Sequence, residues 1–208
     1  MIHLLMRAAI HHQVKEEKAI IPDNYLDILR KYERMKCSEK TKIKFSWLFD
    51  IKPHILNSHV FFNKYIVMNS KWATRLILFN DAETNNAFNI TVGHEITHTE
   101  NQFCFLKFGI KSIKFIAWVN ELHADFGGAK KMADGSREKL LASIEYKKKL
   151  HIDSTDTISH PSWDRRETYA RKYDFGPGLV SEIAKDVGFN DQKIIDRVCE
   201  HYKEIILN

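Results

Sequence analysis

A helical pattern covers residues 84–103, whose sequence is TNNAFNITVGHEITHTENQF. Its apolar residues recur at helical spacing, which predicts one long helix from about Thr84 to about Phe103. His94 and His98 are four residues apart, so on a helix both side chains lie on the same face. Two imidazole rings placed in this way can grip a single metal ion.

Glu95 directly follows the first of these histidines, and residues 94–98 therefore form the pattern His-Glu-x-x-His. The pattern resembles the signature of zinc metallopeptidases, in which the glutamate takes a proton from the metal-bound water. The chain contains 11 histidines, so the odds that such a pattern arises by chance are roughly a few per cent. The alternative is a charged surface helix that happens to carry two histidines.

A catalytic zinc ion takes three protein ligands and keeps a fourth position for water. A second helix is predicted from about Ser112 to Ala133, and on it Glu121 and Asp125 share one face because they are four residues apart. We expect Glu121 to be the third ligand and Asp125 to hydrogen-bond a ligand histidine, His94 in particular. His123 stays an alternative third ligand, although its position two residues from Glu121 places it on a different face.

A third motif follows at residues 159–166, which read Ser-His-Pro-Ser-Trp-Asp-Arg-Arg. The His-Glu-x-x-His pattern, Glu-x-x-Ala-Asp at residues 121–125 and this His-Pro…Arg pattern occur in the order found in gluzincin metallopeptidases. The chain resembles in particular the family that includes the CAAX prenyl endopeptidases and the HtpX heat-shock proteases. The resemblance covers roughly residues 57–170.

This resemblance implies a zincin-like metallopeptidase domain that binds one Zn²⁺ per chain and hydrolyses peptide bonds. By the same resemblance, His160 would lie near the zinc and stabilise the oxyanion, and Arg166 would be a nearby structural ion-pair partner. The family also carries an Asn-Ala element before an edge strand, which Asn57-Ser58 matches only loosely. With the ligand set above, Glu95 would act as the general base.

Membrane members of that family insert transmembrane helices around these motifs. The strongest apolar stretch here, residues 103–119, is interrupted by Lys107, Lys111 and Lys114. A span needs about 20 mostly apolar residues, so we expect no integral membrane segment. The chain then resembles the catalytic core alone.

The cysteines Cys37, Cys104 and Cys199 are odd in number and far apart, which indicates neither a disulfide framework nor a Cys-x-x-Cys metal site. A reduced, cytoplasmic setting is therefore expected.

The other segments predict an α+β fold in a single domain over residues 1–208. A helix is expected at residues 22–37, and three strands at 41–49, 53–62 and 64–69 form a small, mostly antiparallel sheet. A helix at 136–150 and a loop at 151–160 precede two or three helices, interrupted at residues 176–178 and at Gly188. The domain thus divides into an N-terminal helical segment (1–40), the sheet with the zinc-binding helices (41–135) and a C-terminal helical part (136–208).

The formal net charge is only +5, and no nucleic-acid motif is present, so no nucleic-acid partner is expected. The run Lys147-Lys148-Lys149 is interpreted as a solvated helix end. The expected partner is a protein or peptide substrate, extended along an edge strand at residues 64–69. The sequence does not define the oligomeric state.

Three alternatives remain open at this point. The first is a regulatory metalloprotease of the ImmA/IrrE type, against which the His-Pro…Arg pattern argues. The second is a non-catalytic scaffold that keeps the fold, against which the intact Glu95 argues. The third is a toxin or effector that directs the same chemistry at one host protein.

Overall fold

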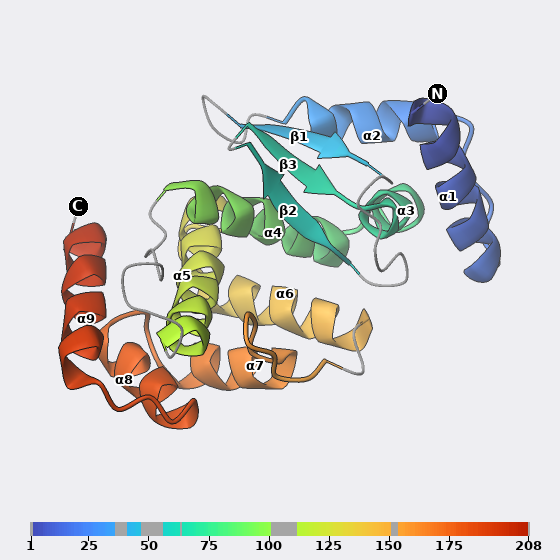
Figure 1. The fold of residues 1–208 in the computed structure, drawn as a ribbon. Helices are drawn as coiled ribbons and strands as arrows, with labels where there is room; N and C mark the ends of the chain where they lie inside the picture. The colour runs from blue at the N-terminus through green and yellow to red at the C-terminus, as the bar shows by residue number, and fades with distance from the viewer. Residues whose placement is uncertain are drawn as a thin grey trace.

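The computed structural model describes residues 2–35, 41–46, 56–62, 64–100, 112–150 and 154–207 of the 208-residue chain. Over these residues the fold is α+β, as expected, and it is mostly helical with a small three-stranded sheet (Figure 1). In chain order the elements are α1 (Ile2–Glu16), α2 (Tyr25–Glu33), β1 (Lys42–Phe45), β2 (Ser58–Phe61), β3 (Tyr65–Met68), α3 (Ser70–Leu78), α4 (Ala82–Glu100), α5 (Ile113–Met132), α6 (Arg137–Leu150), α7 (Trp163–Lys172), α8 (Pro177–Asp186) and α9 (Gln192–Leu207).

The sheet has the strand order β1-β3-β2, which makes β3 the central strand. β2 and β3 are antiparallel, with Val60 opposite Ile66, whereas β1 and β3 are parallel, with Ile43 opposite Ile66. The sheet is therefore mixed, and the expectation of a mostly antiparallel sheet was wrong. Residue patterns predict which segments are strands but not which edges pair or in which direction, and β1 pairs in parallel with the edge of β3 opposite β2. Ile66, Val67 and Met68 are buried consecutively, as in a central strand that is covered on both faces.

This strand order also corrects the expected place of the substrate. Residues 64–69 contain β3, which is paired on both sides and offers no free edge for strand addition. Within the described residues, the edges of the sheet are β1 and β2. Of these, β2 runs beside α4, the helix that carries His94 and His98 (Figure 1).

α3 has no counterpart among the elements predicted from the sequence, and α1 lies in the predicted N-terminal helical segment (1–40) without having been predicted as a separate helix. α3 begins where the Asn69 side chain accepts a hydrogen bond from the backbone N–H of Trp72, at 3.2 Å, and so caps the first turn. α1 buries Ile10 and Val14 against Ala73 and Ile77, which α3 presents. The apolar face of α1 therefore packs against α3, a helix about 60 residues away in the sequence.

The helices α4 and α5 cross at Gly93 and Gly128, where their backbones come into close contact. The candidate site depends on this crossing, because its residues lie on both helices. A Cβ atom on Gly128 would lie 2.7 Å from the His94 nitrogen, and one on Gly93 would lie 2.8 Å from the Gly128 Cα. No real Cβ tolerates such distances, so glycine is required for the two backbones to meet. The helices predicted at 84–103 and 112–133 correspond to α4 and α5.

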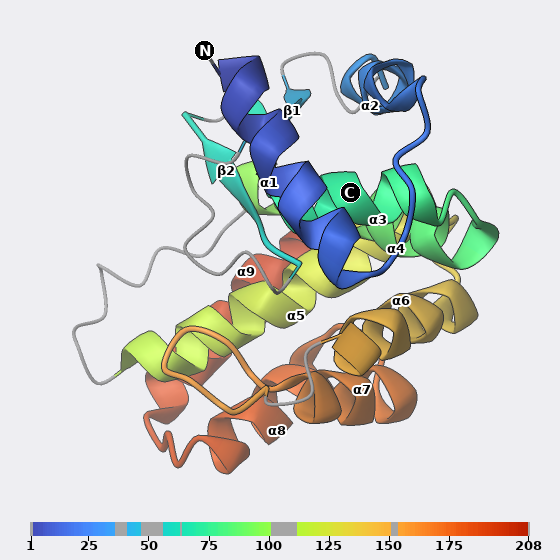
Figure 2. The same ribbon diagram turned by 90° about the vertical axis from the view of Figure 1, so that its right-hand side faces the viewer.

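The elements form layers around α4 and α5 (Figures 1 and 2). The sheet, with α1, α2 and α3 next to it, lies on one side of α4, and α6 and α7 lie on the other. The core between sheet and α4 contains Ile66, Met68, Trp72, Phe88 and Val92. A separate core joins α5 to α8 and α9 and contains Trp118, Leu122, Ile183, Val198 and Tyr202.

The remaining predictions from glycine and proline hold for the C-terminal part. α8 begins at Pro177, and Gly188, with φ of 69°, follows its end. None of the helices in the described part of the chain is long and apolar enough to cross a membrane. Several predicted features lie outside the described residues: Cys37, Cys104, the stretch 101–111 with Lys107 and Lys111, and residues 47–49 and 53–55 of the first two predicted strands.

Candidate metal centre

Three side chains from α4 and α5 converge on one point. The Nε2 atoms of His94 and His98 lie 2.9 Å apart. The Glu121 carboxylate lies 3.6 Å from His94 Nε2 through one oxygen and 3.4 Å from His98 Nε2 through the other. One donor atom from each residue lies within 4.8 Å of the others, and all three side chains are largely shielded from solvent. This group could hold a metal ion, and its donor set is that of catalytic zinc sites.

Asp125 orients the first histidine. Its Oδ1 atom lies 2.9 Å from His94 Nδ1, and the carboxylate, as the acceptor, keeps the proton of a neutral His94 on Nδ1. The lone pair of Nε2 then faces His98 and Glu121, as a metal ligand requires. The hydrogen bond is the one that the spacing of residues 121 and 125 predicts.

Arg166 supplies the positive charge beneath these carboxylates. It donates one hydrogen bond to Glu121 and another, of 3.2 Å, to Asp125. All three side chains are buried. Burial favours the neutral carboxylic acids, but Arg166 outweighs burial and holds the pKa of Asp125 below its usual value and the pKa of Glu121 well below it. Both groups are therefore anionic at neutral pH.

Glu95 is buried beside this group without belonging to it. One carboxylate oxygen accepts a hydrogen bond of 2.7 Å from the Ser58 hydroxyl at the start of β2. Ser58 thus links the edge strand β2 to Glu95 on α4. No sequence pattern assigned this function to Ser58, since the bond joins residues 37 positions apart.

His160 lies at the open side of the group, on the loop before α7. Its Nε2 atom is 3.5 Å from a Glu121 oxygen, and its Nδ1 atom is 2.7 Å from the Ser159 hydroxyl. More than half of its side chain is exposed. The structure therefore brings His160 next to the expected ligands, with one ring nitrogen directed at them.

His123 lies apart from the group, on another face of α5. Its ring is 5.0 Å from the ring of Phe175 and 4.6 Å from that of Tyr202. Desolvation by this packing lowers its pKa to about 4, so the ring is neutral. His123 therefore packs in the core against Tyr202 of α9. Its position does not support the alternative in which it is the third ligand.

A small cleft of about 120 Å³ opens onto His94, Glu95 and Glu121. Its other walls come from β2 and from three helices distant in the sequence. Two wall residues were not expected at the site from the sequence: Lys147 of α6, which is buried, and Trp163 at the start of α7 also line the cleft. The complete lining is Leu56, Asn57, Ser58, Trp72, Thr91, His94, Glu95, Glu121, Lys147, His160, Trp163 and Arg166.

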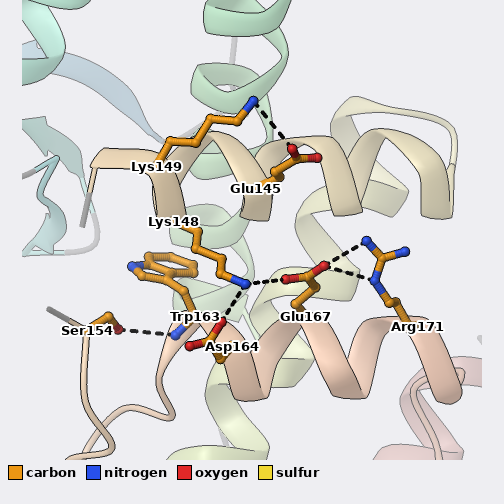
Figure 3. A pocket seen from close by; sticks show the side chains of 8 residues that line it. All are labelled: Glu145, Lys148, Lys149, Ser154, Trp163, Asp164, Glu167 and Arg171. Atoms are coloured by element: carbon orange, nitrogen blue, oxygen red, sulfur yellow. Dashed lines mark hydrogen bonds and ion pairs between the residues drawn. The ribbon is translucent and has the colours of Figure 1, made fainter. Parts of the chain in front are cut away.

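A larger hollow of about 490 Å³ lies on the far side of Trp163, between α6 and α7 (Figure 3). The charged groups in it pair with one another. Lys148 contacts Asp164 and Glu167, and Arg171 contacts Glu167. Three acidic and three basic residues line the hollow, so it presents no excess of either charge.

No protein-family model, curated protein or solved structure matches this chain.

Proposed function

We propose that this protein is a zinc-dependent endopeptidase with a zincin-like domain, similar to the soluble core of the gluzincin family named above. One observation carries the proposal: His94, His98 and Glu121 converge from two helices while Glu95 faces the same cleft. Two imidazoles and one carboxylate are the ligands that zinc prefers in hydrolytic sites, and they leave one position open. A bound zinc ion supplies Lewis acidity, which activates water and polarises a carbonyl group.

Glu95 is suited to move the proton. Its side chain lines the cleft next to the ligand group but is not part of it. As a general base it accepts a proton from the attacking water and later delivers it to the leaving amine. The Ser58 hydroxyl holds one oxygen of the carboxylate, which leaves the other free to make this transfer.

His160 is suited to donate a hydrogen bond to the oxyanion that forms on the attacked carbonyl. When the Ser159 hydroxyl donates to Nδ1, the proton of a neutral ring is on Nε2, which is directed toward Glu121 and the cleft. A donor preorganised at that place stabilises developing negative charge. Arg166 acts through Glu121 and Asp125, whose carboxylates it keeps ionised and in place.

The peptide is proposed to bind in extended form along β2. This strand is an edge of the described sheet, and Ser58 at its start touches Glu95. Addition of a strand to this edge would carry the peptide backbone past the candidate metal site.

Metal content and peptide cleavage together test the proposal. Wild-type protein should contain one zinc per chain by elemental analysis, and His98→Ala should not. Glu95→Gln should retain zinc but cleave peptides at least about 100-fold more slowly, because the amide cannot accept the proton. A zinc-binding protein that cleaves no peptide would instead be a scaffold. Wild-type protein without zinc, or full activity of Glu95→Gln, would sink the proposal.

A further inference from the structure

Lys147 lies in the candidate cleft, which its sequence context does not indicate. The three lysines at residues 147–149 occupy the last turn of α6. Consecutive helical residues point about 100° apart, so they face different surroundings. Lys148 pairs with Asp164 and Glu167 in the outer hollow (Figure 3), whereas Lys147 is only 6% exposed and lines the cleft. The interpretation of this run as a solvated helix end was therefore wrong for Lys147.

The ammonium group of Lys147 has no anionic partner of its own among the described residues. Its Nζ atom lies 5.2 Å from the ring centre of Trp163 and forms no hydrogen bond or ion pair with a described carboxylate. The nearby carboxylates contact other groups through one oxygen each: Asp125 Oδ1 contacts His94 and Arg166, and one oxygen of Glu95 accepts from Ser58. Asp125 acts on Lys147 through its charge, without an ion pair between them among the described residues. A buried ammonium without a partner is costly, so the site favours an incoming anion.

The charge around the cleft favours the same conclusion. Among the described residues there, the carboxylates of Glu95, Glu121 and Asp125 face the cations of Lys147 and Arg166. With three anionic and two cationic groups, the protein's own charges make the cleft net negative. A divalent ion on the candidate ligands reverses the sign, so a substrate with a negative group gains attraction only in the loaded site.

We propose that Lys147, backed by Trp163, forms a carboxylate-binding subsite that recognises a carboxylate of the peptide beside the bond to be cleaved. The proposal deepens the peptidase function and rests on it for the nature of the ligand. The carboxylate is either an acidic side chain or the C-terminal group of the peptide, since both present the same chemistry to an ammonium donor.

The protonation state of Lys147 is compatible with this role. Burial lowers its pKa to about 8, against the opposing effect of Asp125, so the ammonium form still prevails at neutral pH. A bound carboxylate would raise that pKa again. The subsite should therefore weaken as the pH rises above 8.

Matched peptides test the subsite. Each library peptide is made in four forms, with Glu or Gln at one position and with a free or amidated C-terminus. Wild-type enzyme should cleave the carboxylate forms roughly 10- to 100-fold faster in kcat/KM, the worth of one charge-assisted hydrogen bond. Lys147→Met should abolish the preference, and Lys147→Arg should keep part of it. The Glu/Gln pairs and the acid/amide pairs identify the source of the carboxylate.

Lys148→Met is the matched control, because it removes the same charge from the neighbouring residue, which faces the outer hollow (Figure 3). It should leave the preference unchanged. Thermal unfolding checks that every variant is folded. An equal loss for all four peptide forms in Lys147→Met, or a wild-type enzyme without preference, would overturn the subsite while leaving the peptidase intact.

Binding measured without turnover separates the two proposals. Zinc-loaded Glu95→Gln, with and without Lys147→Met, is titrated with the same fluorescent peptides by anisotropy. Tighter binding of carboxylate forms that depends on Lys147 supports the subsite even if wild-type protein proves not to be a peptidase. Equal binding of all forms refutes the subsite, whatever the activity.

Discussion

A buried ammonium group makes the stability of this protein depend on pH. In the folded chain, burial lowers the pKa of Lys147 from 10.5 to about 8, although Asp125, Glu95 and Glu121 oppose the shift and Arg166 adds to it. In the unfolded chain the group keeps its proton up to about pH 10.4. Below pH 8, Lys147 is charged in both the folded and the unfolded chain, and its burial then destabilises the folded chain to the full extent. It is relieved as the pH rises from about 8 to 10, because the unfolded state then binds more protons than the folded state.

Lys147→Met should therefore raise the free energy of unfolding at pH 7 by about 2–4 kcal/mol, since one pKa unit corresponds to about 1.4 kcal/mol. The gain should shrink toward zero near pH 10. This difference in the free energy of unfolding is measured by urea unfolding of wild type and Lys147→Met, both treated with chelator, between pH 6 and 10. Lys148→Met should show no such gain. A gain that is the same at every pH would mean that packing, and not charge, is responsible.

Individual residues differ in how far their place could be predicted. His94, Glu95 and His98 lie within one turn of a helix, so their relative placement follows from helical spacing. The bond between Ser58 and Glu95 joins a strand to a helix, and nothing in either segment indicates it. Lys147 could not be told from Lys148 and Lys149, because the sequence does not show which face of α6 meets the cleft.

At the scale of elements, the contact between α4 and α5 sets the distance between the ligands. Gly128 lies against the backbone next to His94, and Glu121 is on the same helix as Gly128. Gly128→Ala would force the helices apart and move Glu121 away from the histidines. We expect a loss of about 1–3 kcal/mol in stability from overpacking, and weaker zinc binding.

Gly178→Ala is the matched control, because a Cβ at Gly178 would meet nothing within 4 Å and the residue is in α8. It should leave zinc affinity unchanged and stability equal or higher by about 0.5–1 kcal/mol, since alanine favours a helix. Denaturant unfolding and competition with a zinc chelator measure both effects. If Gly128→Ala binds zinc like wild type, the close crossing does not position the ligands.

At the scale of the whole molecule, the proposed ion joins the two helices around which every layer is built. An ion that binds only the folded chain stabilises it by about 4 kcal/mol at a concentration 1,000 times Kd. Chelation should accordingly lower the midpoint of thermal unfolding by about 10 °C. Zinc added back should restore it. Differential scanning calorimetry with and without chelator checks this.

His98→Ala is the control for the chelation experiment, because it lacks one ligand of the candidate site. Its midpoint should be low and insensitive to chelator. If chelator lowers the midpoint of wild type and His98→Ala equally, a metal elsewhere is responsible, or the chelator acts on the protein directly.

The spacing of residues within each segment determined several helices of this protein and the faces on which the candidate site residues lie. The helical period places His94 and His98 on one face of α4, and Glu121 and Asp125 on one face of α5. Glycine and proline separate the C-terminal helices as expected, because both residues disfavour continuation of a helix. These features depend on residues a few positions apart, and the chain encodes them within each segment.

Only the tertiary structure decided which segments meet. The central place of β3, the place of β2 at one edge of the described sheet and the entry of Lys147 into the cleft all depend on packing between distant segments. The crossing of α4 and α5 at Gly93 and Gly128 likewise brings Glu121 to the histidines. The physical reason is that such contacts depend on shape and burial across the fold, whereas spacing along the chain defines only the face of each element.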